Sequence, residues 1–334
     1  MLPWVECPSL ELDLSLPVCE RYSSIPPEAC AKGKRLLRAV LTEVPSVMHF
    51  LADVVRARTR NRFHSEAQAI AHFIGGDWRG VMLANILYDL AIYRYGCSTA
   101  VLPTRNGPVI ARNMDWPPED VIAQTSYLIR THRGGEFVFA SAGWPGSLGV
   151  VTGLSGRGFA IVLNATSCPK RLGLTGYPVL LHIRRVLEDA DSFDSAVMQL
   201  SETRLAAPCL ITVAGEENHQ RVVIERTPRR SAPRWAEEDQ PLFVTNHYRI
   251  MFQGESSSIP GLDETTCSRY DAISELLGRH LPEETADDAK LLYALTDPSV
   301  IQDITAQHVI IHPRQREIRL WVPRQLVDAS DARG

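Results

Sequence analysis

Residues 95–117 read Tyr95-Gly96-Cys97-Ser98-Thr99-Ala100-Val101-Leu102-Pro103-Thr104-Arg105-Asn106-Gly107-Pro108-Val109-Ile110-Ala111-Arg112-Asn113-Met114-Asp115-Trp116-Pro117. The runs on either side of Asn106-Gly107 are rich in apolar and β-branched residues, and Asn-Gly is the strongest short signal for a hairpin turn. We therefore expect antiparallel strands at 97–102 and 108–114. Pairing across the turn would bring Arg112 and Asp115 back towards Cys97. A thiol, a guanidinium and a carboxylate at one end of a hairpin form a candidate nucleophilic site.

Mostly helical sequence precedes this hairpin. Strict alternation of apolar and polar residues at 10–16 predicts one half-buried strand, and apolar residues at helical spacing predict helices at 35–42 and 46–58. Asp77 is a candidate N-cap for a further helix that runs to Leu90. Residues 1–96 are therefore expected to form one strand and several helices.

After Cys97 the predicted strands follow one another quickly. We expect strands at 125–131, 136–141, 147–153, 158–164, 209–213, 221–225, 242–245, 308–312 and 318–322, and helices at 178–188, 193–202, 268–280 and 286–295. The polar stretch 228–240 contains two prolines and is expected to be an exposed loop. Strands in runs and helices in runs predict an α+β layered sandwich rather than a parallel βαβ sheet.

Composition narrows the range of partners. The 334 residues carry a net charge of −4 without a long basic run, so nucleic acid is not expected as a partner. The seven cysteines form no C-x-x-C pair, which is typical of reduced thiols, and no metal-ligand spacing appears among cysteines and histidines. We therefore expect neither a metal nor another cofactor. The N-terminus lacks a signal sequence, and the longest uncharged stretch, Phe137–Gly156, contains five glycines. We expect a cytoplasmic protein without a membrane-spanning helix.

Two motifs of the hairpin, Gly96-Cys97-Ser98-Thr99 and Arg112-Asn113-Met114-Asp115-Trp116, resemble the cysteine N-terminal-nucleophile amidases of the choloylglycine hydrolase superfamily. The resemblance is chiefly to the acid ceramidase and N-acylethanolamine acid amidase group, of which bile salt hydrolase and penicillin V acylase are relatives. Similar segments follow along nearly the whole chain at Leu12–Pro17, Ala84–Tyr88, Gly149–Leu154, Leu163-Asn164, Phe243–Asn246 and Pro260–Tyr270. Their order and spacing make the resemblance specific. It implies an Ntn-hydrolase αββα sandwich, in which two antiparallel sheets lie between helical layers.

The resemblance also implies an inactive precursor in which the Gly96–Cys97 peptide bond is cut autocatalytically. Residues 1–96 would then be an α-subunit-like segment, cleaved but retained, and residues 97–334 the β-subunit-like catalytic part. An α-amine has an unperturbed pKa near ~8, so the amine freed at Cys97 is a suitable general base. Glycine before the bond adds little bulk and allows the unusual backbone angles that help an N-to-S acyl shift.

The resemblance assigns a role to each matching residue. Cys97 would attack the substrate amide and form a thioester that water then hydrolyses. Asp115 would hold the N-terminal ammonium or the thiol, and the charge of Arg112 would favour the thiolate. The side-chain amide of Asn246 would donate to the oxyanion. Asn164 resembles a second oxyanion position, which donates through its backbone.

The resemblance leaves the roles of three further positions, Ala165, Arg269 and His247, to be considered separately. The ceramidase branch has a glutamate directly after the asparagine that matches Asn164, and the role of that glutamate does not carry over to Ala165. Arg269, at the start of an expected helix, is either a site residue or a solvated arginine. His247 follows Asn246, and we expect it to be structural or substrate-facing because the amine is the base in this family.

We interpret the chain as a self-processing cysteine amidase that hydrolyses linear amide bonds of N-acylated small molecules. A lipid amide of the N-acylethanolamine or ceramide type is the expected substrate. One alternative is an acyltransferase, because Gly96-Cys97 with Thr245-Asn246-His247 also resembles the isopenicillin N acyltransferases. Another is an acylase for bile salts, penicillin V or acyl-homoserine lactones. A binding protein that never processes is the third, with Cys97 as a buried strand cysteine.

The apolar faces of the helices at 35–58 raise a separate question about partners. Core packing explains these faces most simply, because apolar residues at helical spacing usually face the interior. The alternative is a peripheral contact with a membrane or lipid surface, which amphipathic helices also make. The sequence predicts no oligomeric state.

Overall fold

The computed structural model describes residues 3–42, 44–87, 89, 96–166, 168, 173, 175–237, 239–252 and 262–331. One set of strands comprises β1 (Trp4–Glu6), β3 (Gly96–Leu102), β4 (Val109–Asp115), β12 (Leu242–Val244), β13 (Thr305–His312) and β14 (Glu317–Pro323). A second set comprises β2 (Ser9–Asp13), β5 (Tyr127–Arg133), β6 (Glu136–Gly143), β7 (Thr152–Ser155), β8 (Ala160–Asn164), β9 (Cys209–Ala214), β10 (Arg221–Arg226) and β11 (Ser231–Trp235). The helices are α1 (Pro27–Leu41), the 3-10 helix η1 (Ser46–His49), α2 (Phe50–Arg58), α3 (His64–Ile74), α4 (Trp78–Ala84), α6 (Glu119–Gln124), α7 (Val179–Asp189), α8 (Phe193–Glu202), α9 (Leu262–Leu277), α10 (Asp288–Leu295) and α11 (Arg324–Asp331).

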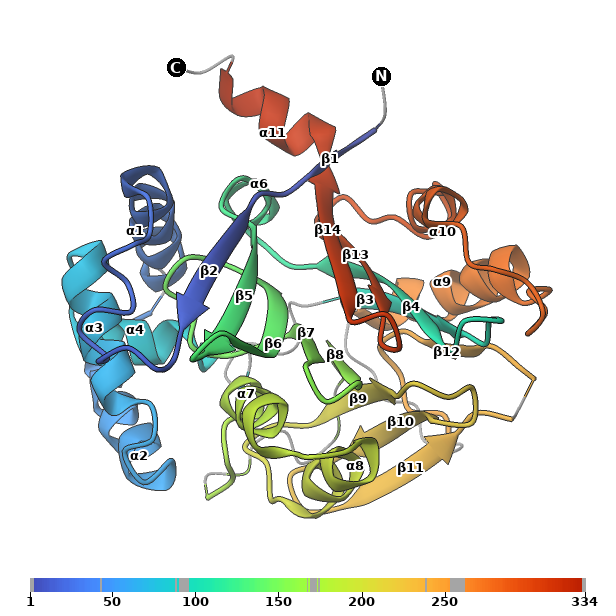
Figure 1. Ribbon diagram of the computed structural model, residues 1–334, viewed down its shortest axis with the longest axis horizontal. Helices are drawn as coiled ribbons and strands as arrows, with labels where there is room; N and C mark the ends of the chain where they lie inside the picture. The colour runs from blue at the N-terminus through green and yellow to red at the C-terminus, as the bar shows by residue number, and fades with distance from the viewer. Residues whose placement is uncertain are drawn as a thin grey trace.

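These strands form two sheets that lie between helical layers (Figure 1). In the described part of the chain, a six-stranded sheet has the order β1-β14-β13-β4-β3-β12, and an eight-stranded sheet has the order β11-β10-β9-β8-β7-β6-β5-β2. Neighbouring strands are antiparallel except for β2, which pairs in parallel with β5. The predicted α+β sandwich of two sheets between helices is confirmed.

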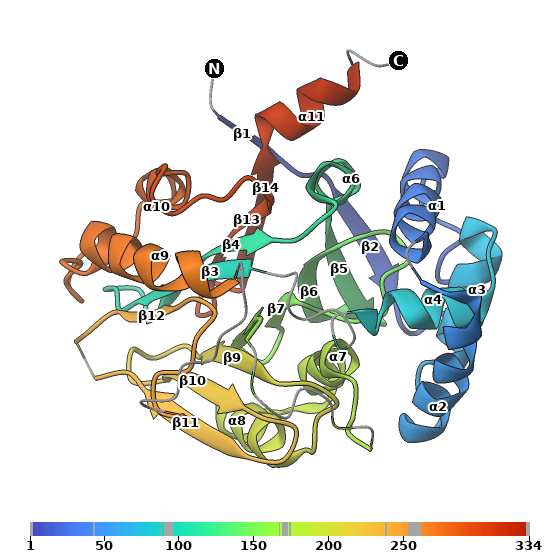
Figure 2. The ribbon, with the colours of Figure 1, turned by 180° about the vertical axis from the view of Figure 1, so that it is seen from behind.

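Apolar side chains fill the space on both faces of each sheet. Val101 and Ile110 of the six-stranded sheet share a core with Leu154 of the eight-stranded sheet, so this core lies between the sheets. Ala100 and Ala111 point to the opposite face and pack with residues of α9 and α10. The eight-stranded sheet is covered on its outer face by α7 and α8, and Figure 2 shows both helical layers from behind. None of the described helices has both the length and the apolar composition needed to cross a membrane.

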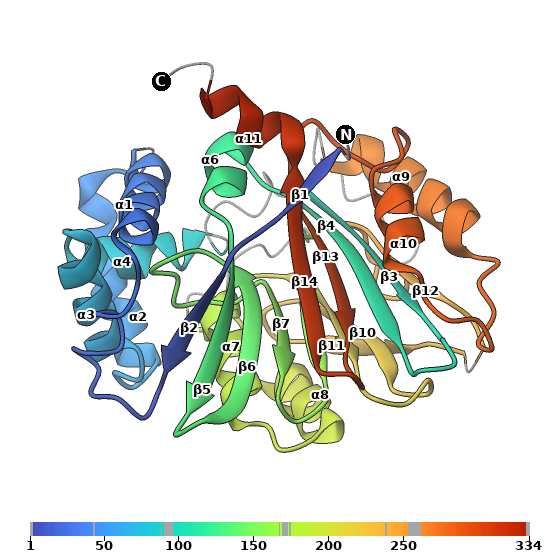
Figure 3. The ribbon, with the colours of Figure 1, turned by 45° about the horizontal axis from the view of Figure 1, so that its top comes forward.

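The segment before Cys97 contributes to both sheets. β1 pairs with β14 at the edge of one sheet, and β2 pairs with β5 at the edge of the other. Helices α1 to α4 form a cluster to one side (Figure 3), with a core that includes Phe63, Ile70 and Met82. The division into 1–96 and 97–334 stays a prediction. These strand pairings would hold the first segment in place after a cut at residue 96.

Most predicted elements are confirmed, and several need correction. The segment before Cys97 contains two strands, β1 and β2, where one was predicted. The predicted exposed loop at 228–240 contains β11, an edge strand that pairs with β10 and includes Pro233. An edge position tolerates proline because the missing N–H is not needed for a further strand. The predicted strand at 147–153 begins only at Thr152, and residues 144–151 form a loop.

The predicted helix cap at Asp77 is confirmed, because its side chain accepts a hydrogen bond from Arg79 N at 3.2 Å. The helix that it begins, α4, ends at Ala84 rather than continuing to Leu90. Leu90 itself lies outside the described residues. The predicted half-buried strand at 10–16 is observed in part, because β2 covers Ser9–Asp13 and residues 14–16 form a turn.

Candidate active site

Cys97 lies near the start of β3, an inner strand of the six-stranded sheet. The pairing of β3 with β4 places Cys97 opposite Met114 and Gly96 opposite Asp115. Because successive side chains of a strand point to opposite faces, Cys97 and Arg112 share the face turned towards the eight-stranded sheet. Asp115 lies on the other face, turned towards α9. The predicted residues therefore meet at one strand end but are divided between the two faces of the sheet.

On the inner face a guanidinium lies against the thiol. Arg112 Nη2 is 3.1 Å from Cys97 Sγ and also donates to Leu163 O at 2.8 Å. Arg112 Nη1 donates to Thr152 Oγ1. Cys97 and Arg112 are both fully buried. A fixed positive charge beside the sulfur favours the thiolate, which is the nucleophilic form of cysteine.

On the outer face a buried carboxylate lies beside the predicted cleavage point. Thr305 donates to Asp115 Oδ1 at 2.7 Å, and Arg269 Nη1 lies 3.7 Å from Oδ2. Oδ2 accepts no hydrogen bond from the described residues. Burial raises the pKa of Asp115, and the charge of Arg269 and the Thr305 hydrogen bond act against this rise. A Cβ at Gly96 would lie 3.1 Å from Asp115 Cβ and 3.2 Å from Oδ2, so a larger residue there would require a small shift of the Asp115 side chain.

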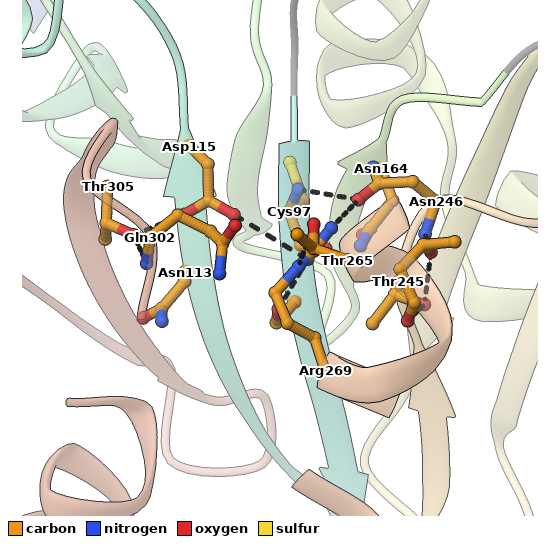
Figure 4. Close-up of polar contacts among 12 residues, drawn as sticks. Cys97, Asn113, Asp115, Asn164, Thr245, Asn246, Thr265, Arg269, Gln302 and Thr305 are labelled. Carbon is orange, nitrogen blue, oxygen red and sulfur yellow. Dashed lines mark hydrogen bonds and ion pairs between the residues drawn. The ribbon is translucent and has the colours of Figure 1, made fainter. Parts of the chain in front are cut away.

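Asn246 and Arg269 hold the backbone of Cys97. Cys97 N donates to Asn246 Oδ1 at 3.1 Å, and Arg269 Nη2 donates to the same oxygen at 2.7 Å. Arg269 Nη1 donates to Cys97 O at 2.8 Å. Figure 4 shows Arg269 between Asp115 and Asn246. Arg269 is only 2% exposed, so it is not a solvated arginine. Asn246 Nδ2 donates to Ala165 O at 2.8 Å, which leaves its second N–H for another acceptor.

Asn164 and His247 have contacts of a structural kind. Thr99 Oγ1 donates to Asn164 Oδ1 at 2.9 Å, and Asn164 Nδ2 lies 3.3 Å from Val244 O, so this side chain links β8 to β3 and β12. Its side chain makes structural links between strands, and the oxyanion role expected for Asn164 is through its backbone. His247 Nδ1 lies 3.1 Å from Thr266 Oγ1, and the ring packs edge-on against Tyr270. His247 is therefore bound to α9, as the structural interpretation predicts.

Sequence reasoning missed the hydroxyl groups that support the charged residues. Thr152 on β7 holds Arg112, and Thr305 on β13 holds Asp115. Threonine is common on strands, so neither residue carries a signal that sets it apart. The strand order places β13 beside β4 in one sheet. The stacking of the two sheets brings Thr152 of β7 to Arg112 of β4. The described residues contain no group of three histidine, cysteine or acidic side chains placed to hold a metal ion.

A largely apolar cavity of about 630 Å³ lies next to Trp116, and none of the six candidate catalytic residues is among the residues that line it. Its walls are formed by α1, α4, residues 116–122 and residues 144–149. Trp116 directly follows Asp115 and stacks on Trp144, with ring centroids 6.4 Å apart. Both tryptophans belong to the buried apolar cluster that contains Cys97. The cavity therefore lies between the N-terminal helices and the apolar surroundings of the nucleophile.

The layered sandwich, with a cysteine at the start of an inner strand of one sheet, defines the fold of the N-terminal-nucleophile hydrolases. The chain matches a family model over residues 102–302, a range that includes Arg112, Asp115, Asn164, Asn246 and Arg269 and begins after Cys97. By this match the chain belongs to the acyl-coenzyme A:6-aminopenicillanic acid acyl-transferase family.

Individual relatives are similar over part of the chain. The N-acylethanolamine-hydrolyzing acid amidase of Oryctolagus cuniculus is 24% identical over 181 residues, which cover 52% of this chain and 50% of that protein. The protein of the same name from Caenorhabditis elegans is 29% identical over 157 residues, or 42% of this chain and 44% of that protein. The match thus spans half or less of these relatives' length. The solved structure of a Caenorhabditis elegans N-acylethanolamine-hydrolyzing acid amidase ortholog is 22% identical, with a TM-score of 0.53, over 65% of this chain and 93% of that one.

Proposed function

We propose that this chain is a self-processing cysteine amidase that hydrolyses the linear amide bond of an N-acylated small molecule. The contact of the Arg112 guanidinium with Cys97 Sγ at 3.1 Å carries the proposal. Arg112 is fully buried, and its guanidinium contacts a hydroxyl, a carbonyl and the sulfur. Burying an arginine is costly unless an anion offsets its charge. The Asp115 carboxylate supplies part of that opposite charge, and the Cys97 sulfur is the group that touches the guanidinium directly. This contact supports Cys97 as the nucleophile rather than a purely structural cysteine.

The first reaction would be cleavage of the chain itself. Cys97 Sγ attacks the carbonyl carbon of Gly96, the Cys97 nitrogen leaves with a proton, and a thioester joins Gly96 to the sulfur. Water then hydrolyses this thioester and leaves the Gly96 carboxylate, the thiol and a free α-amine on Cys97. The Asp115 carboxylate beside Gly96 has an oxygen without a hydrogen bond, which is suited to receive the new ammonium.

Turnover would use the same atoms. The thiolate attacks the amide carbon of the substrate, and the departing amine takes its proton from the α-ammonium of Cys97. Water hydrolyses the acyl thioester, with the α-amine accepting the proton, and the carboxylic acid leaves. The second N–H of Asn246 and the backbone of Asn164 are the candidate oxyanion donors, and a donor of this kind is worth roughly 3–4 kcal/mol. Arg269 would fix the Cys97 backbone during both steps.

The cavity supports an apolar acyl group as part of the substrate. Its volume of about 630 Å³ and its apolar walls suit an alkyl chain rather than a polar one. The relatives named above are N-acylethanolamine-hydrolyzing amidases, and a lipid amide of the N-acylethanolamine or ceramide type is accordingly our proposed substrate. The N-terminal segment forms much of the cavity wall, so we propose that residues 1–96 stay bound after cleavage.

Exposed apolar side chains near the cavity support contact with a lipid surface. Val47 is 75% exposed and Phe50 is 60% exposed, and Val54 follows on α2. Met48, between the first two, lines the cavity. We propose that η1 and the start of α2 touch lipid when the enzyme takes up an apolar substrate.

Maturation is tested by intact mass and a denaturing gel of the wild type and Cys97→Ala. We expect the wild type to give one fragment that ends at Gly96 and one that begins at Cys97, while Cys97→Ala stays intact. The processed protein is then assayed on N-acylethanolamines, ceramide, conjugated bile salts, penicillin V and acyl-homoserine lactones. A wild type that stays intact and binds these ligands as well as Cys97→Ala does would instead indicate a binding protein.

An acyltransferase is the second candidate, because the family model takes its description from an acyl-transferase. The same thioester would then react with an amine instead of water. The processed enzyme is given substrate and rising concentrations of a competing amine, and free acid and new amide are measured. Amide that replaces acid in proportion to the added amine would establish the transferase and reject the hydrolase.

A further inference from the structure

A polar tether joins the N-terminal segment to the wall of the cavity. Asn85 directly follows α4 and is 7% exposed. Its Oδ1 accepts hydrogen bonds from Leu148 N and Gly149 N, both at 2.8 Å, and its Nδ2 donates to Val81 O at 2.8 Å. These bonds use the oxygen as an acceptor and the nitrogen as a donor, so one amide orientation satisfies all of them.

The tether holds the loop formed by residues 144–151 between β6 and β7. From α7, Arg184 Nη1 donates to Leu148 O at 3.1 Å. From α1, Gly33 lies so close that a Cβ there would be 2.5 Å from Pro145 O. Backbone hydrogen bonds fix the end of the loop, because Val150 N donates to Leu180 O at 3.1 Å and Leu163 N of β8 donates to Val151 O at 3.0 Å. Before that end, Asn85 supplies two of the hydrogen bonds that hold the loop, those from Leu148 N and Gly149 N.

This loop forms one wall of the cavity. Trp144, Ser147 and Gly149 line the cavity together with Asn85. The hydrogen bonds that hold Cys97 come from other elements of the fold, chiefly from Arg269 and Asn246. A displaced loop would therefore change the shape of the cavity while leaving the nucleophile in place.

We propose that Asn85 is a positioning residue that sets acyl-chain selectivity. It fixes residues 144–149 from the N-terminal segment and so shapes the cavity wall against which a long acyl chain packs. This inference rests on the proposed function, in which the cavity receives the acyl group. After cleavage at Gly96–Cys97 the tether joins two separate chains. The N-terminal segment then takes part in choosing the substrate.

The test compares processed wild type with Asn85→Leu and Asn85→Asp. Leucine has a similar shape but leaves Leu148 N and Gly149 N without an acceptor, whereas aspartate keeps an acceptor oxygen. Each protein is assayed on the butanoyl and hexadecanoyl amides of ethanolamine, and hexadecanoic acid binding is measured by calorimetry. We expect Asn85→Leu to lower kcat/KM for the hexadecanoyl amide about tenfold or more through KM. The butanoyl amide should react at nearly the wild-type rate. Asn85→Asp should recover part of the loss, because it keeps the acceptor for Leu148 N and Gly149 N but loses the donor to Val81 O.

Unchanged hexadecanoyl kinetics in Asn85→Leu, or an equal loss for both amides, would overturn the inference. A wild type that hydrolyses neither amide would reject the amidase, and the hexadecanoic acid arm would still decide the role of Asn85. If Asn85→Leu does not fold, hydrogen exchange of Leu148 and Gly149 in the wild type decides instead. The inference requires the backbone N–H groups of Leu148 and Gly149 to exchange slowly, and added hexadecanoic acid to slow their exchange further. Fast exchange that the acid leaves unchanged would reject it.

Discussion

Thr305→Val should slow both self-cleavage and turnover, because the Thr305 hydroxyl holds Asp115. Gln302 N donates to Thr305 Oγ1 at 2.9 Å, and the hydroxyl donates onward to Asp115 Oδ1 at 2.7 Å. Since the oxygen already accepts from Gln302, its own hydrogen is left for the carboxylate. Valine has nearly the same shape but can neither donate nor accept. Thr305 and Asp115 are both buried, so water cannot easily replace the lost bond.

The size of the effect follows from the charge of the acceptor. A hydrogen bond to a charged group contributes about 1.5–3 kcal/mol, and ~1.4 kcal/mol corresponds to a factor of ten. If ionised Asp115 holds the Cys97 ammonium, kcat/KM should fall by about 10- to 100-fold. Losing the bond also raises the pKa of Asp115 further, in the direction in which burial already moves it. The ionised fraction then falls most at acid pH, so the loss of activity should grow as the pH is lowered.

Intact mass against time gives the rate of self-cleavage, and kcat/KM of the processed protein is measured across the pH range. Thr305→Ser is the matched control, because it keeps the hydroxyl, and we expect it to stay within about threefold of the wild type. Thermal unfolding of both variants separates a loss of stability from a loss of function. Activity of Thr305→Val equal to that of the wild type would refute the role given to Asp115, and so would a loss that is the same at every pH.

Two further predictions concern the N-terminal segment. Burial raises the pKa of Asp89 from 3.8 to about 7, while a hydrogen bond from Val179 N acts against this rise, so the folded protein keeps a proton that the unfolded chain loses. The free energy of unfolding should therefore decrease as the pH is raised from about 4 to about 7, by at most ~4 kcal/mol. Asp89→Asn keeps the acceptor for Val179 N and should abolish this dependence in urea titrations, and an unchanged slope would contradict it. Val47→Asp with Phe50→Asp should weaken binding to phosphatidylserine-containing vesicles about tenfold or more in sedimentation assays. Met198→Asp, at an apolar residue of α8 that is 52% exposed, is the control and should bind normally.

The sequence predicts the elements of this fold better than it predicts their neighbours. Alternation and the Asn-Gly turn are local signals, so the β3–β4 hairpin is recognisable from the sequence. β11 is not, because its polar, proline-containing stretch becomes a strand only through pairing with β10 at a sheet edge. The loop at 144–151 is the opposite case, because part of it is predicted as a strand and is observed as a loop. Its apolar residues resemble a strand, but they line a cavity and pack against the N-terminal helices.

The candidate site shows the same limit at the level of side chains. Arg112 and Asp115 are three positions apart, and a period of two places them on opposite faces of the strand. The sequence alone therefore predicts that Arg112 and Asp115 lie on opposite faces. The expectation that both side chains approach the Cys97 thiol did not take this spacing into account. The supporting groups Thr152 and Thr305 could not be found in this way. Thr305 comes from β13, whose place beside β4 depends on the order of the whole sheet. Thr152 comes from β7 of the other sheet, and only the packing of the two sheets brings it to Arg112.

The division of the site between two faces explains how one strand end could serve both cleavage and turnover. Asn246 holds the nitrogen of Cys97 and Arg269 holds its carbonyl oxygen, and neither contact involves Gly96. Cutting the Gly96–Cys97 bond would therefore leave Cys97 where it is, with its thiol against Arg112 on the inner face. The freed nitrogen lies at the strand end, where the Asp115 carboxylate on the outer face lacks a donor for one oxygen. If the chain is cut as we propose, the charged groups that turnover would use are already in place before the cut, and Arg112, Asp115 and Arg269 all lie downstream of it.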